Sequence, residues 1–260
     1  MSIARVLRSE WIKARSLRST WITIASTLVV IIAFGVISAL VASGEISPPG
    51  GSDGPNLRGP LGIVMTGADL AVLIIAVFGA VVGAREFSTG MIRTTFSAVP
   101  TRLPVLWSKV AVFIALVLPV VVVGVVAAFF LGMGILENGG AATVAWSDDG
   151  VARSVLGLAY YILGLGIIGL AIGILLRTTA ASIGIVLGAV LFLPALASAL
   201  LPDSWDVVLK YLPSNAGSSF TSIRQLGELM LGPLPGFIVF TGWIALAIVG
   251  AAVVLVRRDA

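Results

Sequence analysis

The chain has 260 residues, of which 58% are hydrophobic and only 11% are charged, and its formal net charge is +4. Soluble domains carry about 25% charged residues, so this composition excludes an ordinary water-soluble fold. The chain contains no cysteine and no histidine, which excludes disulfides and removes the commonest catalytic base and metal ligand. We therefore expect one transmembrane domain over residues 1–260, with short loops and no cofactor of its own.

The N-terminal segment, residues 2–20, is amphipathic and basic. Its apolar residues, among them Trp11, fall on one helical face, while Lys13 and most of the arginines lie outside it. Such a helix lies along the membrane interface, where cations meet anionic headgroups. Glu10 breaks the pattern by falling within the apolar face. Two interpretations stay open: a basic membrane anchor, or an elbow helix that contacts a cytoplasmic partner and uses Glu10 in a buried ion pair.

Six apolar stretches follow, and a helix needs about 20 apolar residues to cross the hydrocarbon core. The first stretch is preceded by a basic 20-residue segment and lacks a clean small-residue cleavage site, so we expect a retained helix and not a signal peptide. The sequence thus predicts an all-α integral membrane protein with six spans. The expected spans are Trp21–Ala42, Ile63–Gly83, Val110–Ile135, Val155–Leu176, Ala181–Leu201 and Phe237–Val256.

Asp69 is the single ionisable residue within an expected span. A carboxylate at the bilayer centre costs roughly 2.5–3.5 kcal/mol, so it must face protein or water. It is either the N-cap of a slightly shorter second span or a polar group in a substrate path.

The cytoplasmic segment 84–109 is expected to hold a short helix. Ser88 or Thr89 can cap this helix at its start, and Pro100 stops it. Its apolar side chains share one face, which packs either on the membrane surface or on a partner. These side chains are Met91, Ile92, Phe96 and Val99.

Glycines and prolines within the spans indicate how the helices pack. Glycine pairs four residues apart allow close backbone approach in lipid, and we expect packing within the chain more than between copies. The pairs are Gly79 and Gly83, Gly169 and Gly173, and Gly184 and Gly188. Pro119 and Pro194 lie within spans and are expected to kink them.

The basic residues orient the spans. Of the 16 lysines and arginines, 12 fall on the side of the two chain ends and 4 on the other. The positive-inside rule therefore places both termini in the cytoplasm, with the chain in the plasma membrane. A net charge of +4 in a soluble protein would suggest nucleic acid, but here the charges serve orientation, so we expect no nucleic-acid partner.

Several motifs occur in a characteristic order. Glu86 closes a span and is followed by Ser88-Thr89-Gly90-Met91-Ile92-Arg93, then Val99-Pro100-Thr101-Arg102, with Lys109 opening the next span. Further motifs are Arg8-Ser9-Glu10-Trp11-Ile12-Lys13, Arg177-Thr178-Thr179-Ala180 and Leu212-Pro213-Ser214-Asn215-Ala216-Gly217. Taken together, these motifs resemble the ABC-2 type permeases of ATP-binding-cassette (ABC) exporters, in particular actinobacterial ones.

The resemblance implies a subunit that forms the substrate path and is driven by two copies of a separate ABC ATPase, which would hold ATP and Mg²⁺. It also implies a permease homodimer, or a heterodimer with a paralogue, in the lipid bilayer. The 84–109 loop would supply the coupling helix, with Glu86, Thr89, Met91, Ile92, Arg93 and Phe96 as coupling residues. Glu10, Trp11 and Lys13 would belong to the elbow helix. Two short re-entrant outer helices would precede the last span, separated by Pro213 and Gly217. The two segments that fit them are Trp205–Leu212 and Phe220–Leu231.

Other functions fit the residues less well. The chain has no GxxxxGK[ST] motif, so it cannot hold nucleotide phosphates in a P-loop, and we expect no enzyme activity of its own. An ion-coupled secondary transporter usually places several ionisable groups near the membrane midplane, where this chain has at most Asp69. Intramembrane proteases need histidine or two facing aspartates. A non-catalytic regulatory membrane protein stays an alternative.

Overall fold

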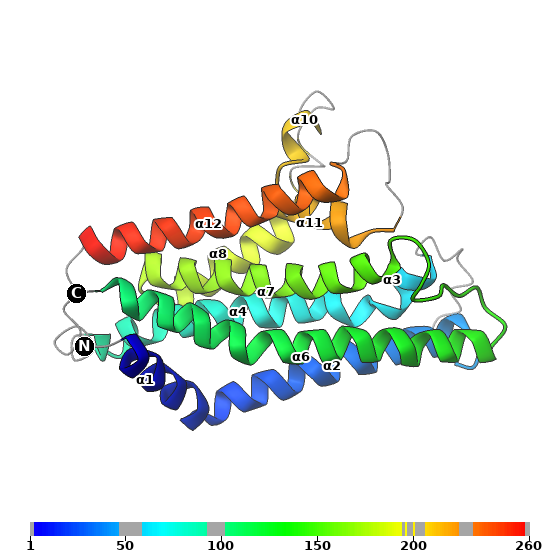
Figure 1. Ribbon diagram of the computed structural model, residues 1–260, viewed down its shortest axis with the longest axis horizontal. Coiled ribbons are helices and arrows are strands. Elements are labelled where there is room, and N and C mark those ends of the chain that lie inside the picture. The colour runs from blue at the N-terminus through cyan, green and yellow to red at the C-terminus, as the bar shows by residue number, and fades with distance from the viewer. Residues whose placement is uncertain are drawn as a thin grey trace.

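The computed structural model describes residues 3–46, 59–92, 102–193, 206–223 and 231–257, together with Leu196 and Leu200. In this part of the chain all regular structure is helical, and the long helices lie side by side in one bundle (Figure 1). The helices in chain order are α1 (Ile3–Ser16), α2 (Arg18–Ala42), α3 (Pro60–Val64), α4 (Thr66–Ser88), α6 (Leu103–Asn138), α7 (Val151–Leu176), α8 (Thr179–Leu187), the π-helix η1 (Gly188–Phe192), α10 (Asp206–Leu209), α11 (Pro213–Thr221) and α12 (Pro233–Arg257).

Five of the described helices are long and apolar enough to cross a membrane: α2, α4, α6, α7 and α12. They confirm the expectation of an all-α membrane protein. Within the stretch expected at Ala181–Leu201, the described residues form an apolar helix over Thr179–Phe192 that includes the π-helical turn η1. Leu193, Leu196 and Leu200 are helical as well. Pro194 lies outside the described residues, so a sixth span stays a prediction.

The helices on either side of the first basic loop are longer than their apolar stretches. α4 continues past Gly83 to Ser88, and α6 runs from Leu103 to Asn138. The expected bounds stopped at the first charges, although Arg85 and Glu86 are good helix formers. Pro104 fits the first turn of α6, where no intrahelical N–H bond is lost. Pro119 lies inside α6 as expected.

The N-terminal amphipathic segment is divided where one helix was expected. Leu17 adopts an extended conformation, with φ −89° and ψ 118°, and Arg18 then begins α2. The result is a corner between α1 and α2 (Figure 1). Ile3, Leu7 and Trp11 are exposed on α1, as expected for a helix whose apolar face meets lipid.

Helices α4 and α7 pack with their backbones in close contact. A Cβ atom on Gly79 or Gly83 would overlap backbone atoms of Gly166 or Leu170, and one on Gly169 or Gly173 would overlap α4 in the same way. These four glycines therefore pack within the chain, as predicted. Gly184 and Gly188 do not, since no atom of another described element lies within 4 Å of the position that a Cβ would take on either residue.

The region before α12 contains two short helices with bounds that differ from the expected ones. Pro213 and Gly217 do not separate helices; they lie within α11. Pro213 occupies its first position, where a missing N–H costs nothing. Gly217 is needed because a Cβ there would overlap the Tyr161 ring of α7. Residues 224–230, expected to form part of the second helix, lie outside the described residues.

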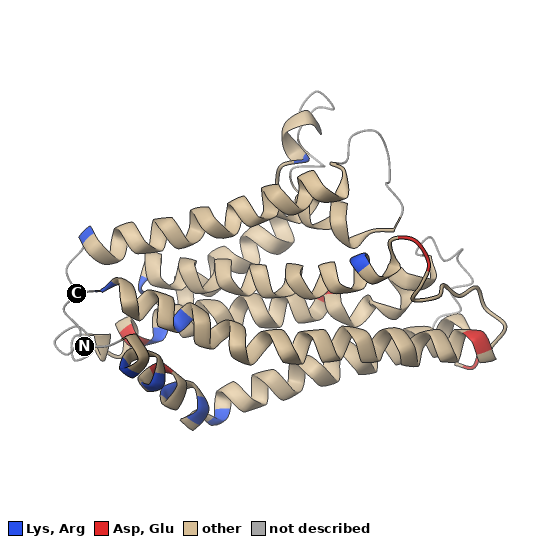
Figure 2. Cartoon of the chain, in the orientation of Figure 1, with Lys and Arg blue, Asp and Glu red and all other residues tan. Residues whose placement is uncertain are grey.

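Charged side chains divide between the two ends of the bundle (Figure 2). The start of α1 and the end of α12 lie at the end that carries most lysines and arginines, called the basic end below. Glu45, Glu137 and Asp148 belong to the loops and helix ends at the opposite end. The positive-inside rule predicts that the basic end faces the cytoplasm.

Single cysteines test this orientation, because the native chain has none. Thr89→Cys and Arg257→Cys mark the basic end, and Glu137→Cys and Asp148→Cys mark the other; all four positions are exposed. We expect an impermeant maleimide to label the second pair in intact cells and the first pair only after permeabilisation. Labelling of Thr89→Cys in intact cells would reverse the orientation.

Candidate functional site

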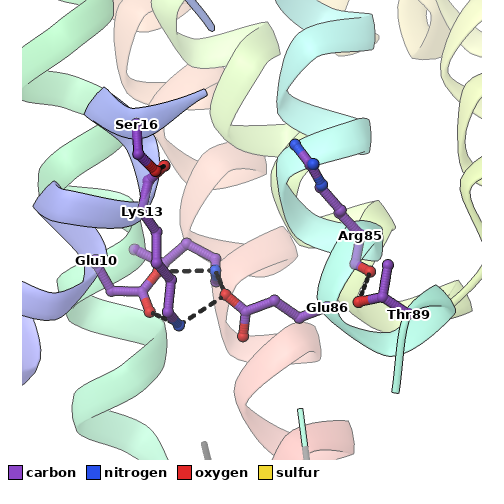
Figure 3. A network of polar contacts seen from close by, with 7 residues as sticks. Glu10, Lys13, Ser16, Arg85, Glu86 and Thr89 are labelled. Atoms are coloured by element: carbon purple, nitrogen blue, oxygen red, sulfur yellow. Dashed lines mark hydrogen bonds and ion pairs between the residues drawn. The ribbon is translucent and has the colours of Figure 1, made fainter. Parts of the chain in front are cut away.

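Four charged side chains meet at the basic end, where α1 crosses the ends of α4 and α6 (Figure 3). Lys109 Nζ of α6 donates to Glu10 Oε2 of α1 at 2.8 Å and to Glu86 Oε1 of α4 at 2.7 Å. Lys13 Nζ of α1 donates to Glu10 Oε1 at 2.6 Å and to Glu86 Oε1 at 3.1 Å. We call these four residues the ion cluster.

Three members of the ion cluster are buried. Glu10 is 5% exposed, Glu86 is 4% exposed and Lys109 is 7% exposed, while the Lys13 side chain keeps 28% of its surface. Two cations and two anions balance, which lets the charges persist away from water. A buried ion pair adds little net stability compared with apolar residues, but losing one partner is costly. The cluster therefore fixes how α1 sits on the bundle.

The local sequence explains how each side chain reaches the cluster. Glu10 falls within the apolar face of α1, which places it against the bundle beside the buried Val6. Glu86 is in the last turn of α4 and Lys109 in the second turn of α6. The cluster thus joins α1 to the two helices that flank residues 89–102.

A second set of contacts ties the remaining helices to this end. The Arg102 guanidinium donates to the Leu255 carbonyl of α12 at 2.9 Å. The Arg177 guanidinium lies 5.1 Å from the centre of the Phe87 ring, a cation–π contact between the end of α7 and α4. Arg177 ends α7 in the left-handed conformation, with φ 60°. Five helices are therefore connected through polar contacts within a few turns of the loop.

A cavity of about 780 Å³ adjoins the ion cluster between α1, α2, α4 and α6. Its walls are mostly apolar, and all four cluster residues line one part of it together with Arg85 and Met91. This volume is within the range of small-molecule sites. The cavity is only partly enclosed by the chain, so it can exchange its contents with the surroundings of the bundle.

The predicted coupling residues have different environments. The Glu86 carboxylate is paired within the ion cluster, and Ile92 is buried, with 5% of its surface exposed. Met91 is 45% exposed, and Thr89 is exposed as well. The Ser88 and Thr89 hydroxyls both donate to the Arg85 carbonyl at the end of α4. Arg93 and Phe96 lie outside the described residues, as does most of the expected coupling helix.

The elbow residues Glu10 and Lys13 lie in the ion cluster. Glu10 is therefore in a buried ion pair, as the elbow-helix interpretation of the N-terminal segment expected, while its contact with a cytoplasmic partner stays a prediction. Trp11 is 40% exposed on α1. Asp69 is exposed in the first turn of α4, where an anion favours the helix dipole. Met65 takes the N-cap position in its place. The substrate-path interpretation of Asp69 stays a prediction.

Neither a scan against protein-family models nor a search of curated proteins found a match for this chain. Among the described residues there is also no group of three or more His, Cys, Asp or Glu side chains that could hold a metal ion. The site is therefore characterised by the ion cluster, the loop beside it and the adjoining cavity.

Sequence reasoning missed Lys109 and Arg85 as site residues. Arg85 was counted for orientation only. Lys109 was counted for orientation and as the residue that opens a span, but it was not expected to pair with Glu86, which closes the previous span. Such charges at adjacent helix ends can pair across the loop that joins them. That pattern, combined with a glutamate on the apolar face of the preceding helix, is the signal that could have indicated the cluster.

Proposed function

We propose that this chain is the transmembrane subunit of an ABC exporter of the ABC-2 type, acting in the plasma membrane and driven by a separate ATPase. One observation carries the proposal: the ion cluster fastens α1 to the ends of α4 and α6, the two helices that flank the loop at the basic end. A transport subunit that is driven by a separate ATPase needs such a firm connection between its helices where the ATPase binds. We call this connection of α1, α4 and α6 through the ion cluster the joint.

The joint suits a mechanical role. A partner can drive transport only through contacts that differ between two arrangements of the bundle. Movement of the loop would shift α4 and α6 together, because Lys109 holds both Glu86 and Glu10. The close backbone contact of α4 with α7 would carry the same movement further into the bundle.

The docking surface of the ATPase is the loop that begins at Thr89. Met91 offers an exposed apolar side chain there, and Arg93 adds a cation in the sequence. An exposed apolar side chain rimmed by polar groups commonly marks a protein interface. ATP and Mg²⁺ would bind the partner, since this chain has no P-loop. Two ATPase copies would serve two permease subunits.

Substitutions at Met91 test the docking surface. In the complex purified from native membranes, Met91→Asp should weaken attachment of the ATPase by about thirtyfold, the effect expected for a buried apolar anchor. ATP hydrolysis that co-purifies with the chain should fall accordingly. Met91→Leu, the matched control, should keep both. Equal ATPase content and activity in the Met91→Asp and Met91→Leu complexes would contradict a docking role.

A further inference from the structure

The cavity beside the ion cluster has a depth that matches one leaflet of a membrane. On α4 its lining runs from Glu86 to Leu73, roughly 20 Å at helical rise. Half of the hydrocarbon core is about 15 Å. The polar residues lie at the basic end of this length, and the rest of the α4 wall is Leu73, Ile74, Val77, Phe78, Val81 and Val82. The cavity is therefore polar at one end and apolar along the rest of its length, as a lipid molecule is.

The polar end of the cavity is lined by one more cation than anions. Glu10 and Glu86, the two acids that line the cavity, are both paired with Lys13 and Lys109. Arg85 also lines the cavity, is exposed, and makes no ion pair with a described residue. Its side chain points away from the cluster (Figure 3).

Further donors lie close to the same end. Ser19 and Thr20, at the corner of α1 and α2, contribute to the lining. Ser16 lines the cavity too, but its hydroxyl already donates to the Lys13 carbonyl. Lys13 uses two acceptors, Glu10 and Glu86, and an ammonium group has three N–H bonds to donate. A group that accepts several hydrogen bonds and carries negative charge complements these residues. The phosphate of an anionic lipid has both properties.

We propose that the cavity binds one net-anionic glycerophospholipid from the leaflet at the basic end, with an acyl chain along α4 and the phosphate at Arg85. Such a lipid would contact both α1 and α4 and so act on the joint described above. The site goes beyond the proposed transport function and does not depend on it. It can therefore be tested on the purified chain without any ATPase.

The test compares two lipids and two variants. The purified chain, stripped of lipid in detergent, is titrated with phosphatidylglycerol or phosphatidylcholine, and bound lipid is counted by native mass spectrometry. We expect one equivalent of phosphatidylglycerol to bind in preference to phosphatidylcholine. Arg85→Gln should weaken phosphatidylglycerol binding about fivefold, the effect of one interfacial cation. Arg257→Gln, a cation on α12 that does not line the cavity, should leave binding unchanged.

A second variant tests the acyl-chain part of the site. Val77→Trp fills the apolar wall without changing any charge, and Val77 is half-buried, so the larger side chain extends into the cavity. It should abolish the one preferred lipid, and its elution profile shows whether it folds. Inorganic phosphate should not compete. The proposal is overturned if wild type shows no preference for phosphatidylglycerol, if Arg85→Gln and Arg257→Gln behave alike, or if a folded Val77→Trp still binds the lipid.

Discussion

Replacing Lys109 with methionine should lower the free energy of unfolding by about 3–5 kcal/mol, because two buried carboxylates then lose their shared cation. Lys13 alone would remain between Glu10 and Glu86, and it is partly exposed. Unfolding by titration with sodium dodecyl sulfate in mixed micelles measures the change. Arg257→Met is the control, since Arg257 is exposed at the same end, and it should change stability by at most about 0.5 kcal/mol.

A double-mutant cycle separates the ion cluster from the packing of the lysine chain. Glu10→Gln combined with Lys109→Met removes one anion and one cation, so the remaining Glu86 and Lys13 still balance. The double variant should be more stable than the sum of the single effects predicts, by about 0.5–3 kcal/mol. Additive effects would mean that Lys109 acts through packing alone, and the joint between α1, α4 and α6 would lose its physical basis.

Gly83→Ala should destabilise the bundle by about 1–3 kcal/mol, even though alanine is the better helix former. The added Cβ would overlap the Leu170 carbonyl. Backbone atoms of α7 cannot relieve this overlap by a change of rotamer, as a side chain could. α4 and α7 would have to separate along their closest contact. The same mixed-micelle titration measures the loss.

The chain offers a matched control for that substitution. Gly184→Ala introduces the same methyl group into α8, where no described neighbour lies within 4 Å. It should be neutral or stabilise the protein by up to about 1 kcal/mol through helix propensity. Equal effects of the two alanine substitutions would contradict the close packing of α4 on α7.

Five spans were predictable because the length of an apolar stretch is enough to indicate a span. The predicted helix bounds were wrong where a charged residue near a helix end is buried and paired. Glu86 ends no helix, since Lys109 and Lys13 neutralise it and α4 can continue to Ser88. Leu17 has no residue-level signal for a break, so the corner between α1 and α2 could not be predicted. α11 begins where the sequence suggested a stop, since proline starts helices as well as ending them.

The candidate site was predicted in part. Glu10 stood out because a charge on an apolar face needs a partner, but its partner Lys109 is 99 positions away in sequence. Only the packing of α1 across α6 brings them together. The cavity left no signal at all, because residues such as Val77 and Val81 look the same whether they face lipid, protein or an open space.

Photocrosslinking at Met91 asks whether an ATPase docks on this chain. A benzophenone amino acid at this position is activated in membranes of the native host, and the adducts are identified by mass spectrometry. The same amino acid at Val123, exposed on α6 within the apolar span, controls for random capture. We expect a P-loop ATPase to be captured at Met91 and to be absent at Val123. Adducts with lipid alone at Met91, or with no ATPase among them, would contradict the proposal that this chain is driven by a separate ATPase.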